Sequence, residues 1–436
     1  MFTPSNNSAD LIKWISTNQQ TWTETELAVF DFVVSGQLGS VDIASGFQYR
    51  DETFNVARGA SSIAQFDAAG NITVPADLLF LGGGLESNAS RDAMAVFVEG
   101  SVDASDKLEL KGALRYEDLD SDSSINPKIA FKYQASDTLA FRGSFSTSFR
   151  EASLAQLTST SIGLQGIQDY NADGSPKGGT VFIRIAAKNN PNLAPEESDN
   201  MNIGALWNPT DQLSMKLDYW AIDYTDVITI ENAQGKVAAN PNDPDVKRTT
   251  GGTLTGVTTK YFNASQVNTS GIDFESTYDF DTAWGQAQVG VNMMHMLEYE
   301  IPLNGVTTDV VGLFNHDNFA RSMPETKAVF HAALQNGNNR LSMFGRYTSD
   351  YRTTRPLDAI AKARGFSQSI DSFFTVDLMD AYTIEMNDSE LKLSVGITNL
   401  FDEEVPLVYD AANWSYDPKH HDPRGRMVYV GFKLSR

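Results

Sequence analysis

The stretch LAFRGSFSTSFR, residues 139–150, alternates between apolar and polar side chains with a strict period of two. Successive side chains of a β-strand point to opposite faces, so this spacing predicts a strand. One face is rich in phenylalanine and the other is polar, which suits a strand with lipid on one side and water on the other. The two sets are Leu139, Phe141, Phe145 and Phe149 against Arg142, Ser144, Ser146 and Ser148.

The same alternation recurs along the chain, at residues 108–116, 128–133, 215–219 and 391–398. We expect the apolar members to face lipid and the charged members to face a water-filled interior. The opposite orientation is unfavourable, because an arginine on the lipid face costs roughly 2–4 kcal/mol at the bilayer midplane. The expected outward set is Leu139, Phe141, Phe145, Ile129, Phe131, Leu393, Val395, Phe432 and Leu434, and the inward set is Arg142, Lys128, Lys132, Lys392 and Lys433.

Short and long polar segments alternate between these strands. Asn, Asp, Gly and Pro accept the backbone angles of a hairpin, and they predict tight turns at Asp137, 208–211, 336–339 and 387–388. Tight turns at one end and long structureless loops at the other are typical of an outer-membrane β-barrel, whose long loops face outward. The long stretches are 50–91, 150–197, 227–270, 299–323, 351–370 and 402–424.

Composition agrees with this interpretation without deciding it. The chain has 436 residues, a net charge of -23, no cysteine and 41% hydrophobic residues. Its longest apolar run is 93–98, far below the roughly 18 residues that a spanning helix needs, so any membrane span must be β. The acidic balance argues against a nucleic-acid partner, because phosphate binding needs clustered Lys and Arg.

The start of the chain predicts that it is part of a longer precursor. Residues 1–7 have neither a basic region nor an apolar region, so they do not form the signal peptide that an outer-membrane protein requires. The first strand is expected near residues 26–34. We count about fifteen strands of about ten residues each. An odd number of antiparallel strands cannot close a barrel, so the first and last strands are expected to lack partners.

Three segments resemble the TonB-dependent outer-membrane receptors, and the resemblance covers nearly the whole chain. The first is Arg142–Leu157, which resembles the strand-to-loop signature of that family. The second, Asn190–Glu196 with Ser198, Asn200 and Gly204, looks like the segment that leads into the next strand. The third is similar to the last two strands of the family and comprises Asn399–Asp402 and Asp422–Arg426 before Val428–Leu434.

The resemblance implies an all-β fold, a transmembrane antiparallel β-barrel that is incomplete, with about 15 of about 22 strands. Residues 1–436 would be the C-terminal part of the barrel, and the signal peptide, TonB box and plug domain would be absent. Two positions depart from the family pattern. Ala152 stands where proline is frequent, and Arg436 ends the chain where the barrel-assembly machinery usually reads an aromatic residue.

The implied function is transport across the outer membrane of a Gram-negative bacterium. Such a receptor binds a scarce solute, such as a siderophore or a carbohydrate, and imports it when TonB pulls on the plug. The expected partners are outer-membrane lipid, the solute, the barrel-assembly machinery and TonB, the last only through the missing plug. No enzymatic activity, cofactor or nucleic acid is expected. A passive outer-membrane porin and a soluble all-β adhesin or lectin are the alternatives.

Aromatic and basic residues in the outward loops are the candidate ligand contacts. Aromatic rings stack on sugars or catecholates, and arginines pair with anionic groups. The competing interpretation is an interfacial girdle or plain loop packing. No catalytic residue and no metal site is predicted. Loop histidines such as the 420–421 pair usually face solvent, and Asx turns explain the aspartates near 169–173 and 243–245. The candidate contacts are Tyr170, Arg352, Arg355, Trp414, Tyr416 and His420.

Overall fold

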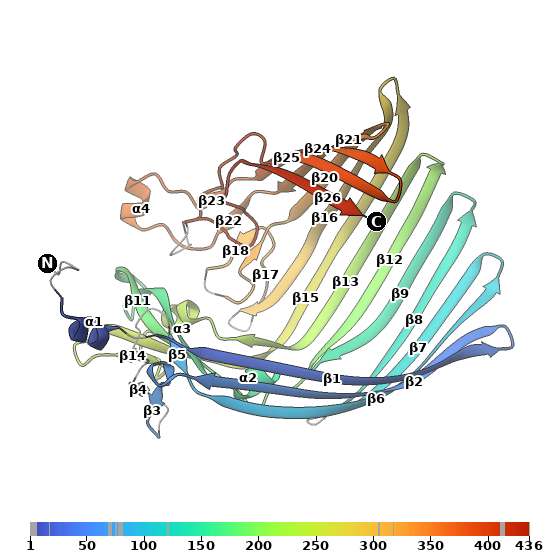
Figure 1. Cartoon of the computed structure of the whole chain (residues 1–436). Helices are drawn as coiled ribbons and strands as arrows, with labels where there is room; N and C mark the ends of the chain where they lie inside the picture. Colours follow the sequence, from blue (N-terminus) through green and yellow to red (C-terminus); the bar gives the residue numbers. More distant parts are fainter. Residues whose placement is uncertain are drawn as a thin grey trace.

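The described chain contains one sheet of 20 strands, and fifteen of these form its wall, each paired antiparallel with the next (Figure 1). The computed structural model describes residues 7–16, 18–68, 72–74, 76, 82–119, 122–303, 306–316, 318–409 and 415–435. The predicted strand count and antiparallel pairing are confirmed. The strands are β1 (Thr21–Leu38), β2 (Val41–Arg58), β6 (Ser87–Ser105), β7 (Leu108–Leu119), β8 (Ser123–Ser136), β9 (Leu139–Arg150), β12 (Glu196–Thr210), β13 (Leu213–Ile230), β15 (Leu254–Thr282), β16 (Gly285–Leu303), β20 (Thr326–Asn336), β21 (Asn339–Thr348), β24 (Phe373–Met386), β25 (Ser389–Thr398) and β26 (Met427–Ser435).

Two-residue turns join the strands at one end of the sheet. The four predicted turns are all found at this end, and three more lie at 39–40, 106–107 and 283–284. Glycine enables two of the seven, because Gly39 and Gly337 adopt φ of 65° and 55°, a region that L side chains rarely occupy. All long connections lie at the other end, on the left of Figure 1. This asymmetry confirms the expected division into short turns and long loops.

The strands are longer and the loops more structured than the sequence pattern predicts. β1 has 18 residues and β15 has 29, not about ten, because strands stay paired above the apolar band; Ile230 still pairs with Tyr261. The prediction of structureless loops is wrong. Their elements are η2 (Ala60–Ser62), β3 (Gln65–Phe66), β4 (Ile72–Val74), β5 (Gly83–Gly84), α2 (Leu154–Thr158), β10 (Ser161–Tyr170), β11 (Pro176–Lys188), α3 (Ala233–Ala239), β14 (Val246–Arg248), β17 (Val306–Asp309), β18 (Leu313–Phe314), β19 (Ser322–Met323), β22 (Tyr351–Thr353), α4 (Ala359–Ala363) and β23 (Ser369–Ile370).

Small apolar clusters hold these loops in place. One cluster joins the β10–β11 hairpin to α3 and β15 through Ile167, Ile183, Val237 and Val257, each less than 5% exposed. Buried apolar side chains in the sheet itself are few, because both of its faces meet solvent or lipid. A further short helix, α1 (Ala9–Ile15), precedes β1. No helix in the described chain is long and apolar enough to cross a membrane.

The strand register separates the two faces of the sheet. Residues paired directly across strands share a face, and Lys132, Arg142, Gly204 and Asp218 follow one another in this way from β8 to β13. Followed from strand to strand, the pairs place all five predicted inward residues on this face and all nine predicted outward residues on the other. The predicted partition is confirmed.

The charged face is the concave one. A single pocket of about 650 Å³ on this face is lined by residues of β9, β13, β15, β16, β20 and β21, among them Arg142 and Arg346. The opposite face exposes large apolar side chains, including Ile129 at 64% and Phe432 at 82%. So broad an apolar surface indicates a membrane-facing side, since water-soluble monomers do not expose one.

The two border strands pair on one side only. β1 pairs with β2 and β26 pairs with β25, and in the described residues no pairing joins β1 to β26. Figure 1 shows them at opposite borders of an open trough. All 18 residues of β1 are exposed. The expectation that the first and last strands lack a second neighbour is therefore confirmed for this part of the chain.

Candidate functional site

A pocket of about 890 Å³ opens among the outer loops, and we call it the loop pocket. Its size lies within the range of small-molecule sites in proteins. It lies between α3, the outer half of β15 and the connection from β16 to β20. Asn232 shapes one wall, because its Oδ1 accepts the backbone N–H of Gly235 at 2.8 Å and so begins α3. The lining includes Asn232, Lys236, Phe262, Leu303, Asn318 and Phe319.

Lys236 is the cation among the described residues of the loop pocket, and its charge is already paired. Its Nζ lies 2.7 Å from Glu231 Oε2 and 2.9 Å from Asp245 Oδ2. Burial of the ammonium group favours its neutral form, but the two carboxylates outweigh this and raise the pKa of Lys236. Lys236 therefore stays charged, and its ammonium group is already paired with two carboxylates of the protein.

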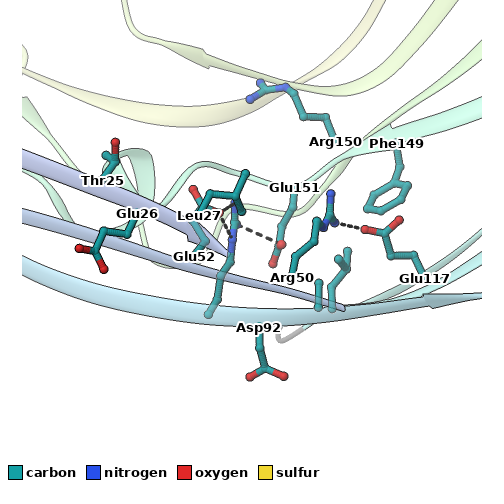
Figure 2. Close-up of a pocket in the computed structure, with 13 residues that line it drawn as sticks. Thr25, Glu26, Leu27, Arg50, Glu52, Asp92, Glu117, Phe149, Arg150 and Glu151 are labelled. Atoms are coloured by element: carbon teal, nitrogen blue, oxygen red, sulfur yellow. Dashed lines mark hydrogen bonds and ion pairs between the residues drawn. The ribbon is translucent and has the colours of Figure 1, made fainter. Parts of the chain in front are cut away.

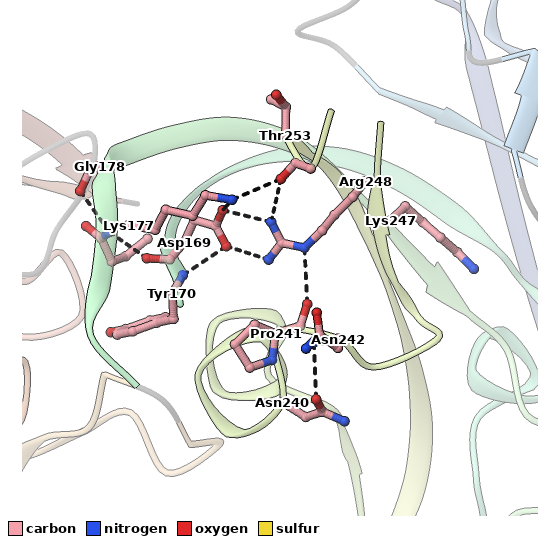
Figure 3. Close-up of polar contacts among 12 residues, drawn as sticks. Asp169, Tyr170, Lys177, Gly178, Asn240, Pro241, Asn242, Lys247, Arg248 and Thr253 are labelled. Carbon is pink, nitrogen blue, oxygen red and sulfur yellow. Dashed lines mark hydrogen bonds and ion pairs between the residues drawn. The ribbon is translucent and has the colours of Figure 1, made fainter. Parts of the chain in front are cut away.

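An ion pair clamps the hairpin of β10 and β11 onto the loop after α3 (Figure 3). The Arg248 guanidinium donates to both oxygens of Asp169, at 2.6 and 2.8 Å, and to the carbonyl of Pro241 at 3.1 Å. The hydrogen bond from Arg248 lowers the pKa of Asp169 against the opposing effect of burial. These bonds hold one flank of the outer loops in a fixed position.

A buried carboxylate in the last long loop contacts two other loop segments. Asp417 is 1% exposed and accepts hydrogen bonds from the hydroxyls of Ser322 and Tyr351, the latter at 2.8 Å. Burial and the neighbouring carboxylate raise the pKa of Tyr351, so the phenol stays protonated and donates. The last long loop is thereby tied to β19 and β22.

Paired charges line the concave wall near the outer ends of β2, β6 and β9. Arg91 lies 2.7 Å from Glu52 and 3.0 Å from Glu151. Arg50 pairs with Glu117, as Figure 2 shows. These residues border a cavity of about 540 Å³. The wall is therefore polar and water-facing, as expected for the inside of a barrel.

A second charge network crosses the middle of the concave wall. Arg142 on β9 donates to Asp218 on β13 at 2.6 and 2.9 Å, across the intervening strand β12. Gly204 of β12 lies directly between them, and a Cβ there would lie 2.0 Å from Asp218 Oδ1. Glycine leaves room for this ion pair. Lys216 and Glu275 pair at 3.0 Å beside it.

The two predicted ligand-contact arginines both make contacts within the protein. Arg352 on β22 donates to Gln368 Oε1 at 2.8 Å. The Arg355 guanidinium lies over the Tyr409 ring, 4.8 Å from its centroid, and donates to Thr180 on β11 at 3.3 Å. Arg355 thus bridges two loops, which is the loop-packing role that the sequence left open.

The other four predicted contacts are dispersed. Tyr170 ends β10 and packs against the cluster around Val237, and Tyr416 is half-buried in the last loop. His420 lines the concave wall, with Nδ1 3.4 Å from Lys327 Nζ. Trp414 lies outside the described residues. The structure therefore does not gather the predicted contacts into one site, and none of those described lines the loop pocket.

Two of the aspartates set aside as turn residues, Asp173 and Asp243, behave in that way, whereas Asp169 and Asp245 form ion pairs with Arg248 and Lys236. Asp173 accepts the backbone N–H of Ser175 at 3.0 Å, and Asp243 accepts that of Asp245 at 2.8 Å. Within the described ranges, no three His, Asp or Glu side chains converge in a geometry that could hold a metal ion.

Comparison with known proteins identifies the family. The family model described as TonB dependent receptor-like, beta-barrel matches residues 2–400. The chain belongs to this family. No curated protein sequence matches. The match confirms the predicted family. TonB-dependent receptors are outer-membrane proteins of Gram-negative bacteria, so the chain is an outer-membrane protein.

Solved structures show the same fold at low sequence identity. The ferric enterobactin receptor PfeA of Pseudomonas aeruginosa is 15% identical with a TM-score of 0.66, and the match covers 95% of this chain and 54% of that one. The siderophore receptor PirA of Acinetobacter baumannii is 14% identical, with a TM-score of 0.63 and coverage of 94% and 55%. The FrpB iron transporter of Neisseria meningitidis is 14% identical, with a TM-score of 0.57 and coverage of 94% and 56%. The chain spans about half the length of these structures.

Membership of the TonB-dependent receptor family favours the receptor over the porin and the adhesin. The family comprises receptors and transporters, not enzymes. Sequence reasoning missed the residues of the loop pocket. Asn232 and Phe319 are neither charged nor part of a motif, and the one available signal was the asparagine-rich composition of residues 315–318 with 232.

Proposed function

We propose that the chain forms the wall of an outer-membrane receptor that imports a small, scarce solute under the control of TonB. The observation that carries the proposal is the family match over residues 2–400 on a sheet with an apolar convex face and a charged concave face. Structured loops with a pocket of about 890 Å³ at one end supply a surface for capture from outside. Siderophores and carbohydrates are the candidate solutes, and all three solved relatives are named for siderophore or iron transport.

Coupling to TonB is assigned to a segment beyond these residues. The chain matches 54% of the PfeA structure, and we propose that it is the C-terminal part of the barrel. A plug with a TonB box would then complete the transporter. Further partners are outer-membrane lipid on the convex face and the barrel-assembly machinery at β26, where Phe432 and Leu434 keep the alternating pattern. No covalent chemistry is proposed.

Uptake by cells that lack their own receptors tests this proposal. Cells expressing residues 1–436 alone are compared with cells expressing the same residues behind a signal peptide, TonB box and plug. Each strain is offered ⁵⁵Fe-loaded enterobactin and ¹⁴C-labelled maltohexaose, with and without TonB. We expect accumulation of one solute only with the plug and only with TonB. TonB-dependent accumulation by residues 1–436 alone would refute the assignment of coupling to a further segment, and TonB-independent accumulation would favour a porin.

A further inference from the structure

The charges of the loop pocket restrict the solute that it can hold, and this inference rests on the proposed function. The ionisable side chains in its described lining are Glu231, Lys236 and Asp243. Lys236 is held between two carboxylates, and Asp243 adds an acidic group. An anionic ferric chelate would find no free cation here and would meet like charge. The pocket is therefore suited to a ligand without negative charge.

Apolar and aromatic surface makes up much of the remaining lining. Phe262 of β15 is 37% exposed, and Phe319 lies on the connection between β18 and β19. Pro302 and Leu303 continue this surface. Aromatic rings bind the apolar C–H faces of sugars, whereas the polar groups of a site fix the hydroxyls. The pocket offers both kinds of contact, and the charge of its lysine is already paired.

One polar atom of the lining lacks a partner. Asn232 Nδ2 is buried and has no acceptor in the described structure, although Oδ1 of the same amide caps α3. A buried donor without an acceptor is unfavourable in general, so a ligand oxygen that met Nδ2 after a small movement of the Asn232 side chain would relieve a standing penalty. A hydroxyl group supplies such an oxygen.

We propose that the loop pocket binds a short, uncharged oligosaccharide in preference to an anionic ferric chelate. The Asn232 amide would donate to a sugar oxygen, and the rings of Phe262 and Phe319 would contact the sugar faces. The paired charge of Lys236 keeps the wall rigid without attracting anions.

Binding to the protein in lipid nanodiscs tests the ligand class. Isothermal titration is carried out with maltohexaose, cellohexaose, xylohexaose and mannohexaose, and separately with ferric enterobactin as the anionic chelate. We expect one or more hexasaccharides to bind and ferric enterobactin to bind at least about tenfold more weakly. Failure of all four hexasaccharides, or tighter binding of the chelate, overturns the proposal.

Two variants and a matched control locate the site. Asn232→Asp keeps the oxygen that caps α3 but replaces the unpartnered donor, and Phe319→Ala removes a ring. Each is expected to weaken hexasaccharide binding about tenfold. Phe366→Ala removes an outer-loop ring that lies 5.4 Å from Tyr409 and does not line the pocket, so its affinity should be unchanged. Wild-type affinity in both pocket variants would overturn the assignment of the site.

The binding and uptake experiments separate the two proposals. Titration needs neither plug nor TonB. Saccharide binding without TonB-dependent uptake in the plug-carrying strain would count against the proposed function alone. TonB-dependent uptake of the ferric chelate without saccharide binding would count against the ligand class alone.

Discussion

At the scale of single residues, His421 is a buried polar group beside the Asp417 carboxylate, so the prediction that the 420–421 pair faces solvent is wrong for His421. It is 4% exposed, packs against Tyr351 and Phe373 at ring distances of 6.1 and 5.1 Å, and has no hydrogen-bond partner on either ring nitrogen in the described chain. Burial lowers the pKa of His421; Asp417 opposes this, whereas His420 and Lys327 reinforce it. The neutral imidazole is therefore the form that the folded loop accepts.

We predict that acidification loosens the last loop. The folded pKa of His421 lies below the unfolded value of about 6.5, so its contribution to stability is present above that value and is lost as the pH falls toward the folded pKa. Amide exchange of residues 415–421, corrected for intrinsic rates, should be faster at pH 5 than at pH 8. Each unit by which the folded pKa of His421 lies below the unfolded pKa corresponds to about a tenfold loss of protection at low pH.

His421→Phe is the control for this prediction. Phenylalanine keeps the packing against Phe373 and cannot take up a proton, so the pH dependence should flatten. An equally steep dependence in this variant would assign the effect to another titratable group, such as His420.

At the scale of elements, each strand of the wall has one face toward lipid and the other toward water. Phe145 on β9 lies on the convex face and is 43% exposed, whereas its neighbour Ser144 lies on the concave face opposite Asn202. The concave face also carries the long-range ion pair between Arg142 and Asp218, which spans one strand. Such a pair stabilises the register of β9 and β13, because a one-residue slip of either strand would move its charge to the lipid face.

We predict opposite tolerance of arginine at these two neighbouring positions. Phe145→Arg, near the middle of β9, should lower the free energy of unfolding by roughly 2–4 kcal/mol. Ser144→Arg places the same charge in the water-filled interior and should change it by less than about 1 kcal/mol. Urea unfolding in lipid vesicles, followed by tryptophan fluorescence, measures both. Equal destabilisation would contradict the assignment of the faces.

At the scale of the whole molecule, the described sheet is an open trough whose border strands, β1 and β26, each pair on one side only. In lipid, unpaired backbone N–H and C=O groups on these borders lack the water that would satisfy them, at several kcal/mol each. β1 carries apolar residues on both faces, including Leu27 and Phe30, which are 64% and 60% exposed. The borders are therefore the least stable part of the described sheet.

We predict that amide exchange proceeds inward from the borders. For residues 1–436 in lipid vesicles, the peptides of β1 and β26 should exchange more than about tenfold faster than those of β13 and β15, which pair on both sides. The central strands serve as the internal reference. Uniform protection across the sheet would show that the borders pair with each other or with a second copy.

The strands, their two faces and the tight turns could be predicted from the amino-acid sequence. A period of two is a local signal, and lipid on one face with water on the other makes that signal strong in each strand, as residues 139–150 show. It also indicated the family through three local motifs. It underestimated strand length, because strands above the apolar band lose the lipid-facing alternation while remaining paired.

The contacts between loop residues could not be predicted from the sequence and became visible in the folded chain. Asp169 and Arg248 are 79 residues apart, and Ser322 and Asp417 are 95 apart. Contacts at such separations follow from how the sheet places loop ends next to one another, and no spacing in the chain encodes them. The loop pocket likewise draws on four separate segments and on uncharged side chains such as Asn232. Charge therefore suggested Arg352 and Arg355 as ligand contacts, although both side chains already make contacts within the protein.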